Sequence, residues 1–149
     1  MTAEPAPITL KPIGIVRSEI KEPTHQKQPE LVSEIIIDKA LMKALDDLDE
    51  FSHIIVLWWI HKTRRPAPLK VRPRGNPENK LMGVFATRSP DRPNPIGKST
   101  VRLLGRRGNI LKVKGLDAID GTPVLDIKPY IPGYDSIDNA TAPPWAIKK

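Results

Sequence analysis

The segment Gly83–Gly97, GVFATRSPDRPNPIG, places side chains that bind anions on a stiff backbone. Arg88, Arg92 and Asn94 alternate there with three prolines, which remove conformational freedom before any ligand arrives. Guanidinium and amide groups held in this way suit recognition of a carboxylate, a phosphate or a base edge. The plainer interpretation is a stiff connection between strands whose charges are incidental.

A second segment, Gly115–Tyr130 (GLDAIDGTPVLDIKPY), carries three carboxylates that are expected to cluster around one turn. Asp117, Asp120 and Asp126 flank the dipeptide Asp120-Gly121, where a positive φ is readily accepted. Neighbouring carboxylates can bind a cation, hold ribose hydroxyls or share a proton as an acid–base pair. The spacing of a calcium-binding EF-hand is absent, and aspartates also cap turns without binding any ligand.

Positive charge is concentrated in the middle of the chain. The 149 residues include 24 Lys and Arg against 17 Asp and Glu, a net charge of +7. Between Lys62 and Lys114, fifteen basic residues face only Glu78 and Asp91, whereas the rest of the chain is net acidic. Such asymmetry attracts polyanions. The densest stretch, His61–Lys80, contains four prolines and is therefore expected to be an extended surface loop.

Short runs rich in β-branched and other apolar residues predict six or seven strands. His53–His61 is apolar on both faces, so we expect it to be a buried central strand in which Trp58 and Trp59 pack into the core. Arg106–Asn109 predicts a hairpin turn. The remaining expected strands are Ile13–Glu19, Glu34–Ile37, Met82–Thr87, Thr100–Leu104, Ile110–Lys114 and Val124–Lys128.

One amphipathic helix is expected near residues 39–50. Leu41, Leu45 and Leu48 recur at spacings of four and three after Asp38, a plausible N-cap.

One helix against so many strands predicts a mainly β protein, a single small closed β-barrel with a long basic, proline-rich loop. We expect the barrel domain over residues 8–135 and a loosely held tail at 136–149, whose Trp145 can dock on the domain or on another subunit.

Composition and motifs exclude several classes of chemistry. Without cysteine there are no disulfides, thiol nucleophiles or cysteine-based metal sites. The glycine fingerprint for dinucleotides, the P-loop and the nucleophile elbow of hydrolases are all missing. His53 and His61 would lie roughly 26 Å apart on a straight strand, which is too far for both to bind one metal ion. The longest apolar run, Ile54–Ile60, is far shorter than the ~20 residues needed to cross a bilayer. We therefore expect a cytoplasmic protein with no metal and no membrane contact.

The two long segments together resemble the TsaA-like (TrmO) family. The resemblance is carried by GVFATRSPDRPNPIG and GLDAIDGTPVLDIKPY, with IGIVRSE near the start, QKQPE after it and DEFSHIIVLWWIH between them. It covers about Ile13 to Asp135. Characterised members of the family methylate N6 of threonylcarbamoyl-adenosine beside the anticodon of certain tRNAs. The resemblance implies a single-sheet β-barrel that binds S-adenosylmethionine and acts on tRNA. It also implies a homodimer with the cofactor near the subunit interface.

Carried over to this chain, the resemblance implies a cofactor site assembled from several short segments. Arg88 is expected to hold the carboxylate of the cofactor, and Asp117 or Asp120 its ribose hydroxyls or ammonium group. Lys98 stands where relatives usually carry an apolar residue, and Lys27 where they usually carry arginine. The expected cofactor residues are Gln28, Pro29, Glu30, Ile60, His61, Arg88, Lys98, Leu116, Asp117, Asp120, Gly121 and Thr122.

Methyl transfer to an acylated exocyclic nitrogen depends chiefly on positioning and is helped by a base. Asp126, Tyr130 and His61 are the candidate bases, with Asp126 and then Tyr130 preferred. Phosphates of tRNA are expected to bind to Arg64, Arg65, Arg72, Arg74, Arg92 and Lys128. Two other functions compete: a non-catalytic, basic RNA-binding β-barrel, and a methyltransferase acting on another nucleoside or on a small metabolite.

Overall fold

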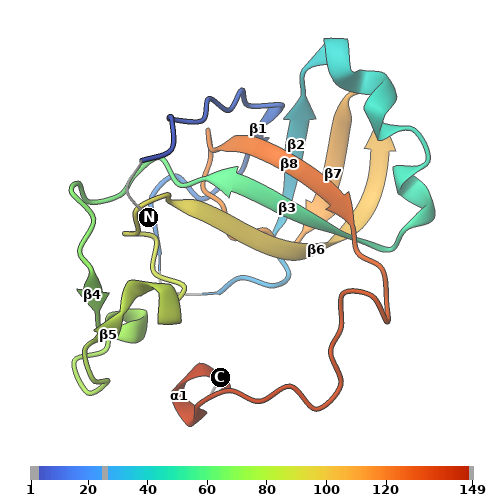
Figure 1. The fold of residues 1–149 in the computed structure, drawn as a ribbon. Coiled ribbons are helices and arrows are strands. Elements are labelled where there is room, and N and C mark those ends of the chain that lie inside the picture. The colour runs from blue at the N-terminus through green and yellow to red at the C-terminus, as the bar shows by residue number, and fades with distance from the viewer. Residues whose placement is uncertain (1–3, 25–26, 148–149) are drawn as a thin grey trace.

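The computed structural model describes residues 4–24 and 27–147, and its centre is a closed barrel of six antiparallel strands (Figure 1). This confirms the expected small closed β-barrel. Around the barrel the order is β1-β2-β7-β6-β3-β8, and β8 pairs with β1 to close it. The strands are β1 (Gly14–Arg17), β2 (Val32–Ile37), β3 (His53–Trp59), β6 (Ile96–Arg107), β7 (Ile110–Lys114) and β8 (Pro123–Pro129).

Alternate residues of each strand fill the barrel. In β3, Ile54, Val56 and Trp58 are buried, whereas the residues between them are partly exposed. β3 pairs with β6 on one side and with β8 on the other, which confirms its central place. Branched aliphatic side chains suit this half-buried, pleated surface. The other core residues are Val16, Ile35, Ile37, Leu45, Val101, Leu111, Val113, Leu116, Ala118 and Val124.

β6 is much longer than the expected strand Thr100–Leu104, because it pairs with two neighbouring strands in succession. Its first half pairs with β3 and its second half with β7, and the ladder shifts between Leu103 and Gly105. A Gly108-Asn109 turn then leads into β7, as the hairpin prediction required. Gly108 has a φ of 61°, and the Asn109 side-chain amide donates to the Ile37 carbonyl at 2.6 Å.

The expected amphipathic α-helix is wrong in type. Residues 39–50 form two 3₁₀ helices, η1 (Lys39–Leu45) and η2 (Leu48–Glu50). Asp38 caps η1 as expected, accepting a backbone hydrogen bond at 3.0 Å. Of the residues in η1 and η2 only Leu45 is buried, so the leucine spacing does not produce the continuous apolar stripe of an amphipathic helix. Asp47, with a φ of 70°, separates the two helices.

The basic segment that follows β3 is mostly irregular, in line with its prolines, and lies beside the barrel (Figure 1). Its two-residue strand β4 (Lys70–Val71) pairs with β5 (Met82–Gly83), and η3 (Pro73–Gly75) lies between them. The expected strand Met82–Thr87 ends early because η4 (Val84–Ala86) follows β5. The Thr87 hydroxyl closes that turn by donating to the Val84 carbonyl at 2.8 Å.

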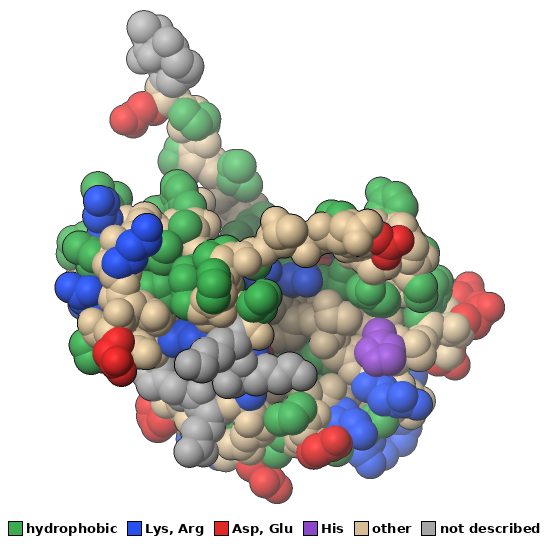
Figure 2. Space-filling model, turned by 90° about the horizontal axis from the view of Figure 1, so that it is seen from below, with side chains coloured by type: hydrophobic (Ala, Val, Ile, Leu, Met, Phe, Trp, Pro, Cys, Tyr) green, Lys and Arg blue, Asp and Glu red, His purple; other side chains and the backbone are tan. Residues whose placement is uncertain are grey.

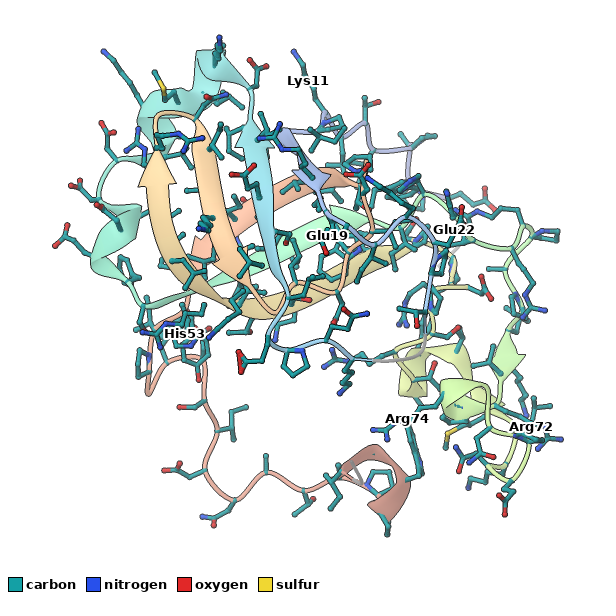
Figure 3. The ribbon with its side chains drawn as sticks, turned by 180° about the vertical axis from the view of Figure 1, so that it is seen from behind. Lys11, Glu19, Glu22, His53, Arg72 and Arg74 are labelled. Atoms are coloured by element: carbon teal, nitrogen blue, oxygen red, sulfur yellow. The ribbon has the colours of Figure 1, made fainter. Side chains whose placement is uncertain are left out.

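The C-terminal segment runs exposed from the end of β8 and returns beneath the barrel to a short helix, α1 (Pro144–Ile147) (Figures 1 and 3). There the Arg74 guanidinium donates to the Ala146 carbonyl at 3.0 Å, and Trp145 is partly buried. The tail thus docks on the segment that carries β4. The proposed boundary between a domain at 8–135 and a tail at 136–149 stays a prediction, and residues 148–149 lie outside the described part. No helix within 4–24 and 27–147 is both long and apolar enough to span a membrane.

Candidate functional site

A pocket of about 620 Å³ lies at the end of the barrel where β3 ends and β6 begins. This size falls in the range of small-molecule sites. Trp58, Ile96 and Leu116 supply apolar surface from β3, β6 and the loop that leads to β8. Ile20 and Pro23, from the loop after β1, form another part of the wall. The pocket therefore combines segments that lie far apart in the sequence.

The indole of Trp58 reaches the pocket because residue 97 is glycine. The two residues are register partners on β3 and β6, and a Cβ at position 97 would lie 2.3 Å from Cε2 of Trp58. Trp58 is only 8% exposed, as the expected core role requires, yet it also lines the pocket. The sequence analysis did not predict this second role. It could have been found only by recognising that the apolar run Ile54–Ile60 pairs with the PIG tripeptide at 95–97.

The pocket is electropositive. Among the described residues that line it, five cations face one carboxylate, that of Asp117. Two of the cations hold the walls: Lys62 pairs with Glu22 at 3.1 Å, and Arg92 donates to the Thr87 carbonyl at 2.9 Å. The other three are Lys27, Arg88 and Lys98. Neither the Arg88 nor the Lys98 side chain forms a hydrogen bond or an ion pair within the described chain, so both are available to an anionic ligand.

Asp117 is the acidic group of this wall. Burial raises the pKa of its carboxyl, and the positive charge of Lys27 opposes that shift. An ionised carboxylate forms strong, charge-assisted hydrogen bonds with an ammonium or hydroxyl group of a ligand. Asp117 and Arg88 together give the pocket one site for a positive group and one for a negative group.

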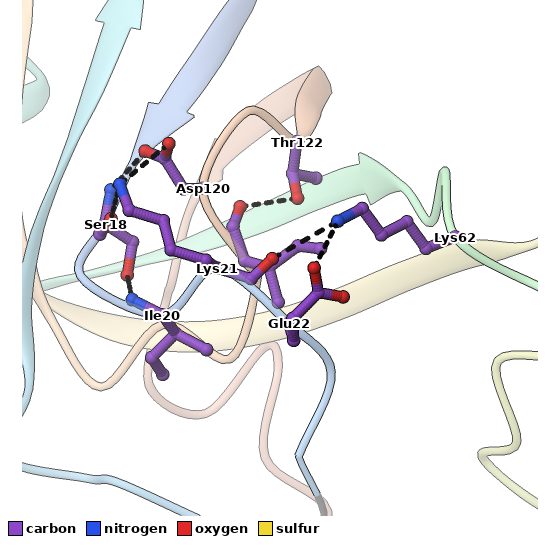
Figure 4. Close-up of polar contacts among 8 residues, drawn as sticks. Ser18, Ile20, Lys21, Glu22, Lys62, Asp120 and Thr122 are labelled. Atoms are coloured by element: carbon purple, nitrogen blue, oxygen red, sulfur yellow. Dashed lines mark hydrogen bonds and ion pairs between the residues drawn. The ribbon is translucent and has the colours of Figure 1, made fainter.

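Asp120 shapes the pocket without lining it (Figure 4). Its carboxylate accepts from the Ser18 backbone N–H at 2.9 Å and pairs with Lys21 Nζ at 3.0 Å. Its own N–H donates to the Ile20 carbonyl at 2.7 Å. Lys62 extends this connection by donating to the Lys21 carbonyl at 3.3 Å. The wall formed by the loop after β1 is therefore fixed to the loop before β8.

Eight of the twelve expected cofactor residues line the pocket, and four do not. Asp120 and Gly121 belong to the turn behind it, where Gly121 has a φ of 81°. Glu30 is directed to Lys114, at 3.2 Å, and Pro29 lies against Gly115. The eight are Gln28, Ile60, His61, Arg88, Lys98, Leu116, Asp117 and Thr122. The lining residues that were not expected include Ile20, Pro23, Thr24, Trp58, Pro90, Ile96, Gly97, Ala118 and Ile119.

The expected cluster of three aspartates does not form. Asp117 faces the pocket, Asp120 is bound to Ser18 and Lys21, and Asp126 lies within β8, where it pairs with Lys128 at 2.9 Å. The turn at Asp120-Gly121 separates the first two, and strand geometry carries Asp126 away. Tyr130 follows β8, its ring 6.5 Å from that of His53 at the opposite end of β3. Of the three candidate bases, only His61 lines the pocket.

All six residues expected to bind RNA have intramolecular partners. Arg64 pairs with Asp91 at 3.1 Å, Arg65 donates to the carbonyls of Arg92 and Pro93, and Arg72 donates to the Asn79 carbonyl at 2.7 Å. Arg74, Arg92 and Lys128 make the contacts given above. These side chains fix the segment between β3 and β5, the loop before β6, and β8. Within the described ranges, no group of three or more His, Asp or Glu residues is placed to hold a metal ion.

Comparison with known proteins places this arrangement in a family. The model of the tRNA-methyltransferase O N-terminal domain matches residues 15–136. The chain belongs to this family. A crystal structure of TrmO from Pseudomonas aeruginosa has the same fold, with a TM-score of 0.78 and 33% identity over 95% of the chain. The family assignment made from the two long motifs is thus confirmed.

Relatives of the TrmO family differ in length. A probable S-adenosyl-L-methionine-binding protein of Methanothermobacter thermautotrophicus is 47% identical over 87% of this chain and 95% of its own. The tRNA (adenine(37)-N6)-methyltransferase of Escherichia coli is 42% identical over 87% of this chain. The chain spans 60% of that E. coli protein, 63% of the crystallised TrmO and 37% of one Archaeoglobus fulgidus relative.

Proposed function

We propose that this chain is an S-adenosylmethionine-dependent methyltransferase that methylates N6 of an adenosine in tRNA. The observation that carries the proposal is the pocket, where the partner-free side chain of Arg88 and the carboxylate of Asp117 accompany an apolar wall. The family assignment and the E. coli relative, which is named for N6 methylation of adenine in tRNA, support the same conclusion.

The residues of the pocket fit the cofactor group by group. The Arg88 guanidinium suits a carboxylate, which it binds through two parallel hydrogen bonds. Asp117 suits the ammonium or ribose hydroxyl groups, and the apolar surface of Trp58 and Leu116 suits an adenine ring. When bound there, S-adenosylmethionine supplies a methyl group on a positively charged sulfur. The chain contributes mainly by orienting the groups and excluding water, which are large effects in such displacements.

We assign acceptance of the proton from the attacking nitrogen to His61. It lines the pocket directly after β3, and the Ile60 N–H bond to the Pro95 carbonyl, at 2.7 Å, anchors that point of the chain. Asp126 forms an ion pair on β8, and Tyr130 lies beside His53, so neither reaches the pocket of its own chain. An imidazole ring carries a nitrogen that can accept a proton from a group bound beside it.

Three finer assignments follow from the resemblance and form part of the proposal. The adenosine is one that already carries a threonylcarbamoyl group, beside the anticodon. The protein works as a homodimer with the cofactor near the interface between subunits. It acts in the cytoplasm. Analytical ultracentrifugation tests the dimer, and tRNA with and without the threonylcarbamoyl group tests the substrate.

Titration calorimetry with S-adenosylmethionine, followed by a methyl-transfer assay on tRNA, tests the function. We expect micromolar binding that Arg88→Ala weakens at least tenfold, because a charge-assisted hydrogen-bond pair is lost. Lys70→Ala is the matched control, since Lys70 is exposed and lies outside the pocket. Binding of tRNA without any cofactor binding would favour the non-catalytic barrel. Cofactor binding with no transfer to any tRNA would favour a methyltransferase for another nucleoside or a metabolite.

A further inference from the structure

The outer face of β6 and β7 carries a row of cations that the fold itself does not use. Alternation along β6 buries Ser99 and Val101 and exposes Lys98 and Arg102. Beyond the shift in the ladder, Arg107 is exposed on β6 and Lys112 on β7. We refer to Lys98, Arg102, Arg107 and Lys112 as the β6–β7 row.

The four side chains of the β6–β7 row form no hydrogen bond or ion pair with any part of the chain that the structure describes. This contrasts with Arg64, Arg65 and Arg72, whose guanidinium groups hold neighbouring loops. Unpaired cations on a strand face contribute little to folding. They are, however, ready to bind phosphates without first losing a partner.

One member of the row also faces a like charge on the neighbouring strand. Arg102 lies directly opposite Lys114 across the β6–β7 ladder, and Lys114 pairs at 3.2 Å with Glu30, whose side chain is 82% exposed. Like charges opposite one another on paired strands are destabilising. A fold that keeps such a pair gains from it when a polyanion neutralises both charges.

The row begins at the pocket. Lys98 is both the first member of the row and a lining residue of the pocket, and it pairs in register with Leu57 of β3. From Lys98 to Arg107 the strand spans roughly 30 Å at about 3.3 Å per residue. Figure 2 shows Lys and Arg side chains on both sides of the hollow in the lower face of the molecule. A nucleic acid strand that enters the pocket can therefore continue along β6.

We propose that the β6–β7 row is the main phosphate-binding surface for RNA, holding the backbone of the strand whose nucleotide occupies the pocket. The inference rests on the proposed function for its choice of polyanion. It places the principal RNA contacts on β6 and β7. The sequence predicted them at Arg92, at Lys128 of β8 and at four arginines of the proline-rich segment, namely Arg64, Arg65, Arg72 and Arg74.

A triple variant, Arg102→Gln, Arg107→Gln and Lys112→Gln, tests this assignment and leaves Lys98 in the pocket unchanged. The control is Lys11→Gln, Lys39→Gln and Lys43→Gln, which removes three exposed charges from other elements. We expect the row variant to bind total tRNA at least tenfold more weakly at 0.1 M salt. The slope of log K against log salt should fall by about 2 to 3, because each phosphate contact contributes about 0.7 to 0.9. Cofactor affinity should stay unchanged.

The outcomes separate this inference from the proposed function. Equal tRNA affinity and equal salt slope in the two triple variants would overturn the row as the RNA surface, whether or not the parent protein methylates tRNA. A parent protein that binds tRNA through the row but transfers no methyl group would keep the inference and overturn the function. Absence of tRNA binding by the parent at 50 mM salt, with binding instead to polyglutamate, would assign the row to an acidic protein and overturn the RNA surface.

Discussion

Gly97 lies so close to the indole of Trp58 that any side chain at position 97 would occupy the same space as the ring: a Cβ would be 2.3 Å from Cε2 and 2.7 Å from Nε1. The contact joins β3 to the start of β6, and both residues line the pocket. One residue thus sets both the packing of the barrel end and the shape of the ligand site.

Gly97→Ala should therefore lower both stability and cofactor affinity. Forcing a methyl group into this contact displaces the ring, and overpacking of this kind costs about 1–3 kcal/mol of unfolding free energy. Urea denaturation and calorimetric titration measure the two effects. Gly105→Ala on the same strand is the control, since nothing lies within 4 Å of a Cβ there. If both alanine variants behave alike, the contact does not shape the pocket.

Asp120→Asn should weaken cofactor binding although Asp120 does not line the pocket. The amide can still accept from the Ser18 N–H, but the ion pair to Lys21 is lost, and the loop after β1 gains freedom. We expect a several-fold rise in Kd, measured by calorimetry. Asp46→Asn, which breaks an exposed ion pair with Arg106 elsewhere on the barrel, should leave Kd unchanged.

The pH dependence of stability gives a separate readout for Asp120. The Ser18 N–H bond, and then Lys21, hold the pKa of this carboxyl below its usual value of 3.8. Its contribution to stability is therefore complete above that value and is lost as the pH falls through the lowered pKa. Asp120→Asn should remove this part of the acid dependence in chemical denaturation. An acid profile identical to that of the parent would contradict the role assigned to the carboxylate.

The contribution of Asp117 to stability should depend on pH in the opposite direction to that of Asp120. Burial raises the pKa of Asp117, so its contribution to stability is greatest below the ordinary value of 3.8 and is lost as the pH rises through the raised pKa. Binding of a cationic ligand group follows the charged form and weakens as the pH falls through the same pKa. Calorimetry on the acid side should show cofactor affinity falling for the parent. Asp117→Asn should be about tenfold weaker at neutral pH and nearly independent of pH. An equally steep profile for the variant would assign the titration to another group.

The barrel could be predicted from the sequence because each of its strands is locally marked by β-branched residues. The run Ile54–Ile60 shows this most clearly, since its alternate residues fill the core. The full length of β6 could not be predicted, because Gly97 and Gly105 resemble loop residues and are extended only through pairing with β3 and β7. The spacing of Leu41, Leu45 and Leu48 suggested a buried stripe, yet Leu41 is 40% exposed.

The pocket was only partly accessible to sequence reasoning for a related reason. The segments containing Arg88 and Asp117 are recognisable by themselves, whereas the contributions of Ile20 and Trp58 depend on which chain segments meet at the barrel end. Side-chain hydrogen bonds explain why the cations predicted to bind RNA differ from those left without partners in the structure. Nothing in the order of residues shows that Arg72 is bound to the Asn79 carbonyl while Arg102 has no such partner in the described structure. The sequence gives the number of charged side chains, but it does not show which of them are free to bind a ligand.

His61→Asn should reduce methyl transfer without affecting cofactor binding. General-base catalysis contributes about 10²- to 10⁴-fold, so we expect kcat to fall by about two orders of magnitude, with the Kd for S-adenosylmethionine within twofold of the parent. Asp126→Asn is the matched comparison, because its carboxylate pairs with Lys128 on β8. A normal rate for His61→Asn together with a large loss for Asp126→Asn would mean that the base reaches the pocket from a second subunit.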